Sequence, residues 1–429
     1  MTGDSVVISG PRPLRGRLRL PGEKGMSHRA LVFGAVAHGP TRVRRLAPGD
    51  DVARTAAALA QLGVSITREG ELTTIVGRGF DALRSPDGSI DCGNSGTTMR
   101  ILSGLLAGRP FRSVLTGDAS LVERPMARVV EPLRAMGARI DGRDGGARAP
   151  LEIDGGGLVG CRIELATASG QVKTALAVAG LQARGTTEIV EPAPSRDHTE
   201  RMLAAIGAPI VRVDARTLRV ERGEMSAFSI DLPGDPSSAA FFVVAAAITP
   251  GSELVLEDVA INPGRIAFLD VLRRMGADIE VTPRDERLGE PAGDVVVRAS
   301  ALRATTIECH EPFIDEVPAL AVAASFAEGV TEFHDAAELR MKESDRIATI
   351  AEMLAALGVT AQPRADGLVV RGGRPTAAMV HAHGDHRIAL AAAIAANAVA
   401  GASTVDDWSS VAVSYPGFLD DLERLTDVA

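Results

Sequence analysis

The stretch Ala-Ile-Gly-Ala at residues 205–208 closes an amphipathic segment and has the form of a helix end. Glycine adopts a positive φ at no steric cost, so it suits the position that follows the last turn of an α-helix. The same pattern, in which a hydrophobic residue, Gly and then Ala or Val follow one another, closes four other segments, at residues 61–64, 135–138, 274–277 and 356–359. Five copies of one signal predict an internal repeat.

A second, more apolar helix belongs to each copy and also runs into a glycine. These helices are expected at residues 30–39, 101–108, 175–185, 239–251, 320–329 and 388–401. Short strands are expected after them, as at 41–46, 186–190, 253–256 and 331–334, and after the amphipathic helices, as at 218–221 and 367–371. Each unit therefore comprises a helix, a strand, a second helix and strands over roughly 65–80 residues. The sixth copy stops after its second helix, at residues 416–425.

The length of the chain favours two lobes. It has 429 residues, whereas a single hydrophobic core stops growing at about 250–300 residues. One repeat cannot bury both of its faces, so repeats should associate through their apolar helices. Six repeats in two lobes of three are the simplest partition, with a crossover at residues 231–236, Asp-Leu-Pro-Gly-Asp-Pro. An ordinary doubly wound α/β sheet is the alternative, but it does not predict five matching glycines.

Composition narrows the class of protein. Hydrophobic residues make up 45% and charged residues 24%, as in ordinary globular proteins, and the net charge of -9 argues against nucleic acid as a partner. The three cysteines are far apart without a CxxC motif, which disfavours structural zinc or disulfides and fits a reducing cytoplasm. We see no signal peptide, and apolar runs such as 239–248 are about half a membrane span. We therefore expect a cytoplasmic protein that binds neither nucleic acid nor membrane.

Polar residues gather just before or at the start of all six apolar helices. A helix N-terminus has free N–H groups and the positive end of the dipole, so it favours anions. A run such as GNSGTT at 93–98 lets the backbone approach a phosphate or carboxylate closely. Ser, Asp and Asn at such positions are usually only N-caps, but their recurrence with cations favours an anion site. The cations are Lys24, Arg29, Arg100, Lys173 and Arg387.

Three further clusters leave alternatives open. Arg124 precedes a proline, where a helix can begin. Lys342 and Arg346 are four residues apart, which would place them on one face of a helix. A surface helix with salt bridges is the alternative there, because acidic residues alternate with these cations. Three histidines at 381, 383 and 386 could suggest a metal, but no carboxylate or Cys stands at a ligand spacing, so no metal is expected. The sequence contains no GxxxxGK[ST] run, so an ATP-driven kinase is not supported.

Seven motifs together resemble one family. They are PGEKGMSHRAL (21–31), DCGNSGTTMR (91–100), ERPM (123–126), SRDHTERML (195–203), PGDPSSAAFF (233–242), ELRMKESDRI (338–347) and GDHRIAL (384–390). Their order along nearly the whole chain is similar to that of the 5-enolpyruvylshikimate-3-phosphate synthase family. The resemblance implies an α/β fold with two lobes, each of three βαβαββ repeats, known as the enolpyruvyl transferase fold or inside-out α/β barrel. Residues 21–232 would form the N-terminal lobe, and residues 1–20 with 233–429 the C-terminal lobe.

The resemblance also implies a reaction. The enolpyruvyl (1-carboxyvinyl) group of phosphoenolpyruvate would move to the 5-hydroxyl of 3-phosphoshikimate with release of phosphate, in the sixth step of the shikimate pathway to chorismate. No cofactor and no metal would take part, glyphosate would compete with phosphoenolpyruvate, and the enzyme would be a monomer.

Roles follow by matching positions to the family motifs. Lys24 would lie between both substrates, and Arg29 would face the shikimate carboxylate. Asp315 matches the proton acceptor, and Lys24 and Glu343 are the candidates for the proton on carbon. The phosphoenolpyruvate side comprises Asn94, Gly96, Arg124 and Arg387. The 3-phosphoshikimate side comprises Ser169, Gly170 and Gln171, with Ser195 and Arg196 near the phosphate. Lys342, Glu343 and Arg346 match the family's KExDR group.

Some positions depart from the family. Gly25 stands where a serine usually touches the shikimate substrate, and Glu23 stands where Ser or Asp usually precedes the lysine. Residues 413–416, Val-Ser-Tyr-Pro, lack a lysine that some members have. The alternatives are UDP-N-acetylglucosamine enolpyruvyl transferase, whose loop cysteine is missing from 116–124, a paralogue with another phosphorylated cyclic acceptor, and a non-catalytic anion-binding protein.

Overall fold

The structure is a computed structural model that describes residues 4–309 and 311–427. The chain divides into two compact units. The N-terminal unit comprises Gly22–Leu232 and the short segment Glu286–Glu290. The C-terminal unit comprises Met1–Pro21, Pro233–Asp285 and Pro291–Ala429. Each unit has a large hydrophobic core of its own.

The described part of the N-terminal unit contains three four-stranded sheets with one common order. In each sheet a parallel pair is followed by two antiparallel neighbours. The sheets are β14(Ser229–Asp231)-β3(His38–Arg44)-β5(Leu72–Arg78)-β4(Ser65–Glu69), β6(Ile90–Asp91)-β7(Arg112–Thr116)-β9(Arg148–Asp154)-β8(Arg139–Gly142) and β10(Arg162–Glu164)-β11(Thr187–Val190)-β13(Thr217–Val220)-β12(Ile210–Arg212).

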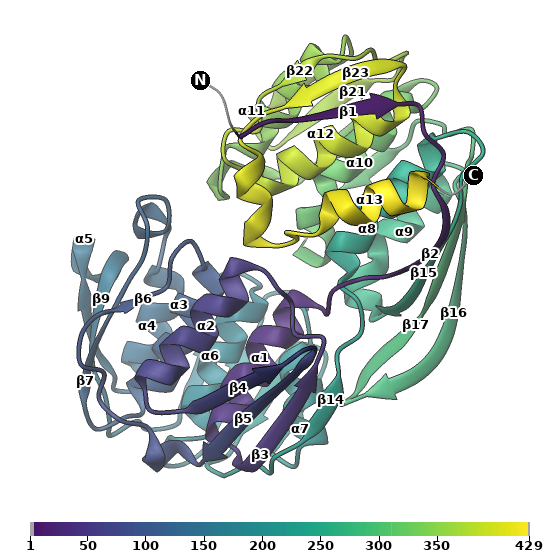
Figure 1. The fold of residues 1–429 in the computed structure, drawn as a ribbon. Helices are drawn as coiled ribbons and strands as arrows, with labels where there is room; N and C mark the ends of the chain where they lie inside the picture. Colours follow the sequence, from purple (N-terminus) through teal and green to yellow (C-terminus); the bar gives the residue numbers. More distant parts are fainter. Residues whose placement is uncertain (1–3, 310, 428–429) are drawn as a thin grey trace. The chain divides into compact units, whose positions relative to one another are not determined.

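Two kinds of helix accompany these sheets (Figure 1). The apolar helices α1(Lys24–Val36), α3(Gly96–Ala107) and α6(Gly170–Gly180) are buried almost throughout. Helices α2(Asp50–Gln61), α4(Ala127–Ala135) and α7(His198–Ala205) are amphipathic, and α5(Arg143–Gly146) is a short turn. Helices α3 and α6 touch backbone to backbone at Gly104, where a Cβ would lie 2.0 Å from the carbonyl oxygen of Ala175. Only glycine fits there.

The C-terminal unit repeats this plan. Its sheets are β16(Asp278–Arg287)-β17(Glu290–Arg298)-β15(Glu253–Ala260)-β2(Arg15–Arg19), β18(Thr306–Glu308)-β19(Val330–His334)-β21(Gly367–Arg371)-β20(Thr360–Arg364) and β1(Val6–Gly10)-β23(Gly401–Val405)-β22(Met379–Val380). The buried helices α8(Pro236–Ile248), α10(Val317–Phe326) and α12(His386–Ala398) pack against one another. The amphipathic helices are α9(Pro263–Arg274), α11(Arg346–Ala356) and α13(Phe418–Thr426).

The predicted repeat and fold class are confirmed. Five repeats contain, in chain order, a buried helix, a strand, an amphipathic helix and two further strands. In the sheet of each of these repeats, the strand that follows the buried helix pairs in parallel with one additional strand at the sheet edge. The first repeat takes that strand from β14, at the far end of the unit, and the fourth takes it from β2. The five predicted glycines all have positive φ, from 78° to 97°. They are Gly63, Gly137, Gly207, Gly276 and Gly358.

One local prediction is wrong. Lys342 and Arg346 do not share a helix, because the 3-10 turn η4(Ala337–Met341) ends before Lys342 and α11 begins only at Arg346. Asp345 caps α11 and takes the intervening residues out of helical conformation. The alternative of an exposed salt-bridged helix also fails, since the Arg346 side chain is 1% exposed. Within the described residues, none of the helices has both the length and the apolar character needed to cross a membrane.

Candidate active site

Polar side chains form N-caps on the buried helices α1, α3, α6, α8 and α12, whereas α10 has no side-chain cap within the described ranges. Ser95 accepts a hydrogen bond from the Thr98 N–H at 3.2 Å, and Ser169 accepts one from the Val172 N–H at 3.4 Å. Asp235 and Asp385 cap α8 and α12 in the same way. A cap satisfies one of the four N–H groups that the first turn leaves without a helical partner. Capping therefore does not exclude an anion at the same helix start.

Arg29 lies in the N-terminal unit and joins three helices. Its guanidinium donates to the Gly25 and Gly170 carbonyl oxygens at 2.8 and 3.1 Å, and to the hydroxyls of Thr174 and Thr199 at 2.8 and 2.9 Å. Burial lowers the pKa of Arg29 from its ordinary value, although nearby Glu23 opposes the shift. Because these four acceptors are neutral, they orient the guanidinium without cancelling its charge.

Lys24 occupies the first turn of α1 and forms an ion pair with Asp51, with 3.0 Å between Nζ and Oδ2. The neighbouring Glu23 caps α1 through the Met26 N–H, and its Oε1 lies 3.7 Å from Nε2 of His198. A Cβ built on Gly25 would lie 3.1 Å from a Glu23 carboxylate oxygen and 3.2 Å from Arg29 Nη1. The Glu23 carboxylate therefore occupies part of the space that a serine at position 25 would use.

The second predicted loop brings Asn94, Gly96 and Arg124 together with Gln171. Arg124 donates to the Asn94 amide oxygen at 2.6 Å. Arg100 donates to the Gln171 amide oxygen at 2.7 Å and passes so close to Gly96 that a Cβ there would lie 2.7 Å from its Nη1. A Cβ contact under 3.0 Å is essentially never seen, so the guanidinium uses the room that the glycine leaves.

Gly170 and Arg196 are adjacent, since a Cβ on Gly170 would lie 3.3 Å from the Arg196 Cβ. The Ser195 hydroxyl donates to Glu191. Lys173 was expected to strengthen an anion site at a helix start, and the structure corrects this. Its side chain is fully buried, and its ammonium lies 2.9 Å from Glu191 and 3.0 Å from Glu200. The charge of Lys173 is balanced by these two carboxylates inside the protein.

Asp315 is the centre of the C-terminal unit's candidate residues. It lies in the 3-10 segment η3(Glu311–Glu316), directly before α10. Its carboxylate is 3.4 Å from Arg346, 3.6 Å from Lys342 and 3.9 Å from Arg387, and its carbonyl oxygen accepts a hydrogen bond from Arg387 at 3.1 Å. Three cations around one carboxylate favour its ionised form. The predicted KExDR group and Arg387 are thus gathered around the predicted proton acceptor.

Arg346 also binds Glu343 at 2.5 Å and the fully buried Asp385 at 2.8 Å. Burial works against the charged guanidinium, but Asp385 and Glu343 outweigh it and hold the pKa of Arg346 above its ordinary value. Burial likewise opposes ionisation of Asp385, and Arg346 reverses the effect, so the pKa of Asp385 is lowered. Glu343 is half-buried and held by the same arginine.

Several residues that hold the site were not predicted from the sequence. Asp385 anchors Arg346, and Asp51 binds Lys24. His198 follows the predicted Ser195 and Arg196, and it bonds at 2.7 Å to Glu290, a residue 92 positions away. Of these acidic residues, only Asp385 could have been found from the sequence, because it stands next to His386 and Arg387 at a predicted helix start.

The histidines at 381, 383 and 386 do not gather around a common point. His381 pairs with Asp406, and His383 lies 3.1 Å from Glu352. Among the residues that the structure describes, no group of three or more His, Cys, Asp or Glu side chains could hold a metal ion. His28 is fully buried, and burial lowers its pKa to about 3, so it is neutral near pH 7.

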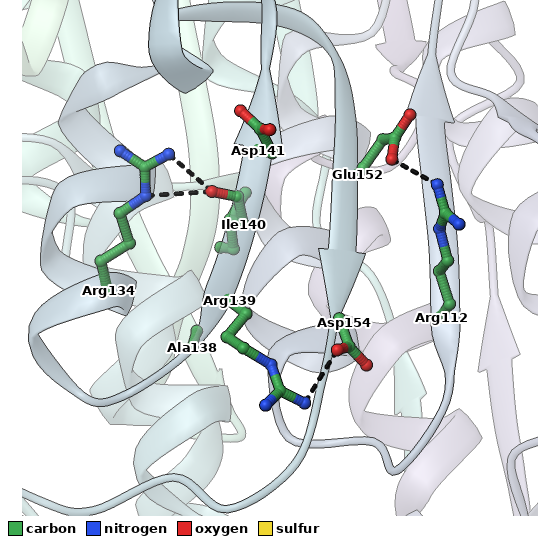
Figure 2. A pocket seen from close by; sticks show the side chains of 8 residues that line it. All are labelled: Arg112, Arg134, Ala138, Arg139, Ile140, Asp141, Glu152 and Asp154. Carbon is green, nitrogen blue, oxygen red and sulfur yellow. Dashed lines mark hydrogen bonds and ion pairs between the residues drawn. The ribbon is translucent and has the colours of Figure 1, made fainter.

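A cavity of about 530 Å³ lies along β8 and β9 and contains none of the predicted residues. Figure 2 shows the side chains that line it. Its arginines are engaged by neighbours: Arg112 pairs with Glu152 at 2.5 Å, and Arg139 pairs with Asp154 at 2.8 Å. Arg134 donates twice to the carbonyl oxygen of Ile140. Because none of the predicted residues lines this cavity, we do not assign the active site here.

Comparisons with known proteins converge on one family. The family model described as EPSP synthase (3-phosphoshikimate 1-carboxyvinyltransferase) matches residues 8–422. A 3-phosphoshikimate 1-carboxyvinyltransferase of Synechococcus sp. (strain JA-3-3Ab) is 49% identical, over 99% of this chain and 97% of that protein. The same-named protein of Chloroflexus aurantiacus (strain ATCC 29366 / DSM 635 / J-10-fl) is also 49% identical, over 99% of both.

Solved structures agree. EPSP synthase from Acinetobacter baumannii superposes with a TM-score of 0.88 at 40% identity, over 99% of this chain and 98% of that one. The enolpyruvyl transferase NikO from Streptomyces tendae has a TM-score of 0.81 at 20% identity, with the same coverage. At that identity the likeness to NikO supports the fold alone.

Proposed function

Because this chain belongs to the EPSP synthase family, we propose that it transfers the enolpyruvyl group of phosphoenolpyruvate to the 5-hydroxyl of 3-phosphoshikimate and releases phosphate. This is a transferase activity of the shikimate pathway, which leads through chorismate to the aromatic amino acids. The observation that carries the mechanism is the position of Asp315, whose carboxylate is within 4 Å of Lys342, Arg346 and Arg387.

Asp315 is the proposed base. The 5-hydroxyl attacks the enol carbon of phosphoenolpyruvate, and its proton passes to the Asp315 carboxylate. The methylene carbon gains a proton in the same addition. Loss of a proton from that carbon, together with departure of phosphate, then restores the double bond. Surrounding cations keep Asp315 ionised between turnovers, and a placed base of this kind is worth about 10²–10⁴-fold in rate.

Lys24 and Glu343 are the two candidates for the proton on carbon. Lys24 carries three N–H donors, one of which is directed to Asp51. Glu343 is half-buried and paired with Arg346. Measuring exchange of the methylene hydrogens of phosphoenolpyruvate with solvent in Lys24→Met and Glu343→Gln would separate them, because only loss of the carbon acid-base group stops that exchange.

The remaining predicted residues bind the substrates in this proposal. Guanidinium groups hold carboxylates and phosphates through two parallel hydrogen bonds, which suits Arg124, Arg346 and Arg387 to phosphoenolpyruvate. Arg29 is oriented by neutral acceptors, and we assign it to the shikimate carboxylate. The other binding residues are Lys24, Gly25, Asn94, Gly96, Ser169, Gly170, Gln171, Ser195, Arg196, Asp315 and Lys342.

The proposal also covers the oligomeric state of the protein, its location in the cell, and its cofactors and partners. We propose a cytoplasmic monomer that needs no cofactor or metal and binds neither nucleic acid nor membrane. The lobe boundaries, 21–232 against 1–20 with 233–429, stay a prediction. Sedimentation at working concentration tests the monomer, and activity after extensive chelation tests the independence from metals.

A phosphate-release assay with phosphoenolpyruvate and a panel of acceptors tests the function. We expect phosphate release that depends on 3-phosphoshikimate and a product with one added carboxyvinyl group. The specific observation that favours a paralogue is Gly25 with Glu23, since this pair alters the loop that touches the acceptor in the family. Release with another phosphorylated cyclic acceptor, and none with 3-phosphoshikimate, would establish that alternative.

A further inference from the structure

Glu316 is a fully buried carboxyl directly beside the proposed base. It follows Asp315 at the point where the 3-10 segment η3 passes into α10. The two side chains face different surroundings: Asp315 is 18% exposed and lies near three cations, whereas Glu316 is 0% exposed. A buried carboxyl is unfavourable unless it finds hydrogen-bond donors and a cation. The interior of the C-terminal unit therefore has to supply partners for Glu316.

These partners come from two other helices. The hydroxyl of Ser237, in the first turn of α8, donates its single hydrogen to Oε1 of Glu316. The same hydroxyl accepts a hydrogen bond of 2.8 Å from Nη2 of Arg265, which lies in α9 and is 1% exposed. Nη1 of Arg265 is 3.9 Å from Oε1 of Glu316. Ser237 thus links a buried guanidinium to a buried carboxyl, and it joins η3 to α8 and α9, which pack against α10 (Figure 1).

Arg265 is itself held by the start of α8. Its Nη2 lies 3.5 Å from Oδ1 of Asp235, and the same oxygen caps α8 by accepting the Ser237 N–H at 2.7 Å. Asp235, Ser237, Arg265 and Glu316 therefore form one buried network that connects α8, α9 and η3. None of the four belongs to the proposed set of substrate-binding residues.

The start of α10 is held differently from the starts of the other buried helices. Over residues 4–309 and 311–427, a side-chain cap closes the first turn of α1, α3, α6, α8 and α12, but not of α10. Glu316 occupies the N-cap position of α10, where a side chain commonly accepts a hydrogen bond from its own helix. The Glu316 side chain accepts one from Ser237 instead. Contacts with α8 and α9, rather than a cap, therefore fix the place where η3 meets α10.

We propose that Glu316 is a positioning residue for Asp315, and that Arg265 acts on Glu316 through the Ser237 hydroxyl. The network holds the backbone of residues 315–316 from the inside, while Arg387 donates to the Asp315 carbonyl oxygen at 3.1 Å. Together they keep the Asp315 carboxylate among its three cations. The inference rests on the proposed function and deepens it, since a base displaced by about 1 Å can lose roughly 10²-fold in rate. Glu316 is fully buried and touches no substrate in this proposal.

Ser237→Ala breaks the network with the smallest change. The backbone N–H that Asp235 caps is retained, but Glu316 loses its donor and Arg265 can approach the carboxyl directly, which shifts η3. We expect kcat to fall about ten- to a hundredfold, whereas the KM for each substrate should stay within about twofold. Glu316→Gln is the conservative variant, because its amide oxygen still accepts from Ser237, so its kcat should stay within about threefold of the parent value.

Ser325→Ala is the matched control. Ser325 is a fully buried serine of α10 whose hydroxyl donates to the Val322 carbonyl oxygen at 2.7 Å, within the same helix. Its removal should lower stability in a urea titration and leave kcat unchanged. A double variant tests the route of the effect. In Asp315→Asn, which has already lost the base, adding Ser237→Ala should lower the residual turnover by less than about twofold.

Crystal structures of the parent protein and of Ser237→Ala measure the displacement directly. We expect the Asp315 carboxylate to move away from at least one of Lys342, Arg346 and Arg387. An unmoved Asp315, an unchanged kcat in Ser237→Ala, or an undiminished loss in the Asp315→Asn background would each overturn the inference. So would equal rises in both KM values with kcat kept, or a loss in Glu316→Gln as large as in Ser237→Ala. Failure of the proposed function is a separate result, since the parent protein would then release no phosphate with 3-phosphoshikimate, while the two structures would still show whether Ser237 fixes Asp315.

Discussion

Cations at the helix starts of the two units have different partners. In the N-terminal unit, Arg29 and Arg100 donate to carbonyl, hydroxyl and amide oxygens. In the C-terminal unit, Arg346 binds three carboxylates. Neutral partners orient a cation and leave its charge for an anionic ligand, whereas carboxylate partners balance it. Arg29 and Arg100 are thus oriented to hold anions, whereas Arg346 has two tasks in this proposal: it balances the carboxylates used for proton transfer, and it contacts phosphoenolpyruvate. Lys24, paired with Asp51, and Lys173, paired with Glu191 and Glu200, depart from this pattern in the N-terminal unit.

Replacing Asp315 by Asn tests the proton-transfer side of this comparison and should have the largest effect. The amide cannot take the hydroxyl proton, so we expect kcat to fall by about 10²–10⁴-fold. Binding of 3-phosphoshikimate, measured by calorimetry, should stay within about tenfold. Asp345→Asn is the control, because an N-cap tolerates Asn well. Turnover like that of the parent protein in Asp315→Asn would remove Asp315 as the base.

Arginine removal in the two units should differ in its cost to stability. Arg346→Met leaves the fully buried Asp385 without its closest cation, and breaking a buried pair costs about 3–5 kcal/mol. Arg124→Met removes hydrogen bonds to the neutral Asn94 and Ser120 and should cost about 1 kcal/mol. Urea unfolding of both variants measures the difference. Equal losses would mean that the carboxylate partners do not distinguish the two units.

The repeat was predictable from the sequence because its signals are local. A glycine such as Gly207 ends a helix through its own φ, whatever packs around it. The pair Lys342 and Arg346 shows where local reasoning stops. Their spacing predicted one helix face, yet a capping Asp345 breaks the helix, and the two cations meet at Asp315 from different segments.

The candidate site was predictable as a set of positions but not as a network. Lys173 stands at a helix start like Arg29, and the sequence does not distinguish them. Burial distinguishes them, because the buried Lys173 forms ion pairs with Glu191 and Glu200, whose positions depend on the fold. Glu290 reaches His198 from a hairpin tip 92 residues along the chain. A contact of that sequence separation has no local signal.

Gly96→Ala tests the anion-binding side. The new Cβ would lie 2.7 Å from Arg100 Nη1, so the guanidinium must move from Gln171. Nη1 is the far end of a flexible side chain and can shift, so this overpacking should cost at the low end of the usual range, about 1–1.5 kcal/mol, or roughly tenfold in affinity. Glyphosate should compete with phosphoenolpyruvate, and because it is the longer anion, its inhibition constant should rise more than the KM of phosphoenolpyruvate. Equal loss of both, or no inhibition of the parent protein, would contradict this prediction.

Gly25→Ser should have the smallest effect and tests the acceptor. A hydroxyl bonded to a charged substrate group is worth about 1.5–3 kcal/mol, but here the added Cβ would lie 3.1 Å from Glu23 and 3.2 Å from Arg29. Contacts this tight require both side chains to move by a few tenths of an ångström, and Glu23 can accept the new hydroxyl hydrogen. We therefore expect the KM for 3-phosphoshikimate to fall by less than about tenfold, with the KM for phosphoenolpyruvate unchanged.

Glu23 provides the control for the Gly25 prediction. In Glu23→Ser with Gly25→Ser, the second serine no longer meets a carboxylate, so the gain in KM should reach its full size of roughly tenfold or more. The comparison depends on Arg29, which keeps its bond to the carbonyl oxygen of residue 25 in either variant. If the true acceptor is another phosphorylated ring, the added hydroxyls have no partner on it. Steady-state kinetics would then show no gain in either variant with 3-phosphoshikimate, and the altered loop would be a specificity determinant for the other acceptor.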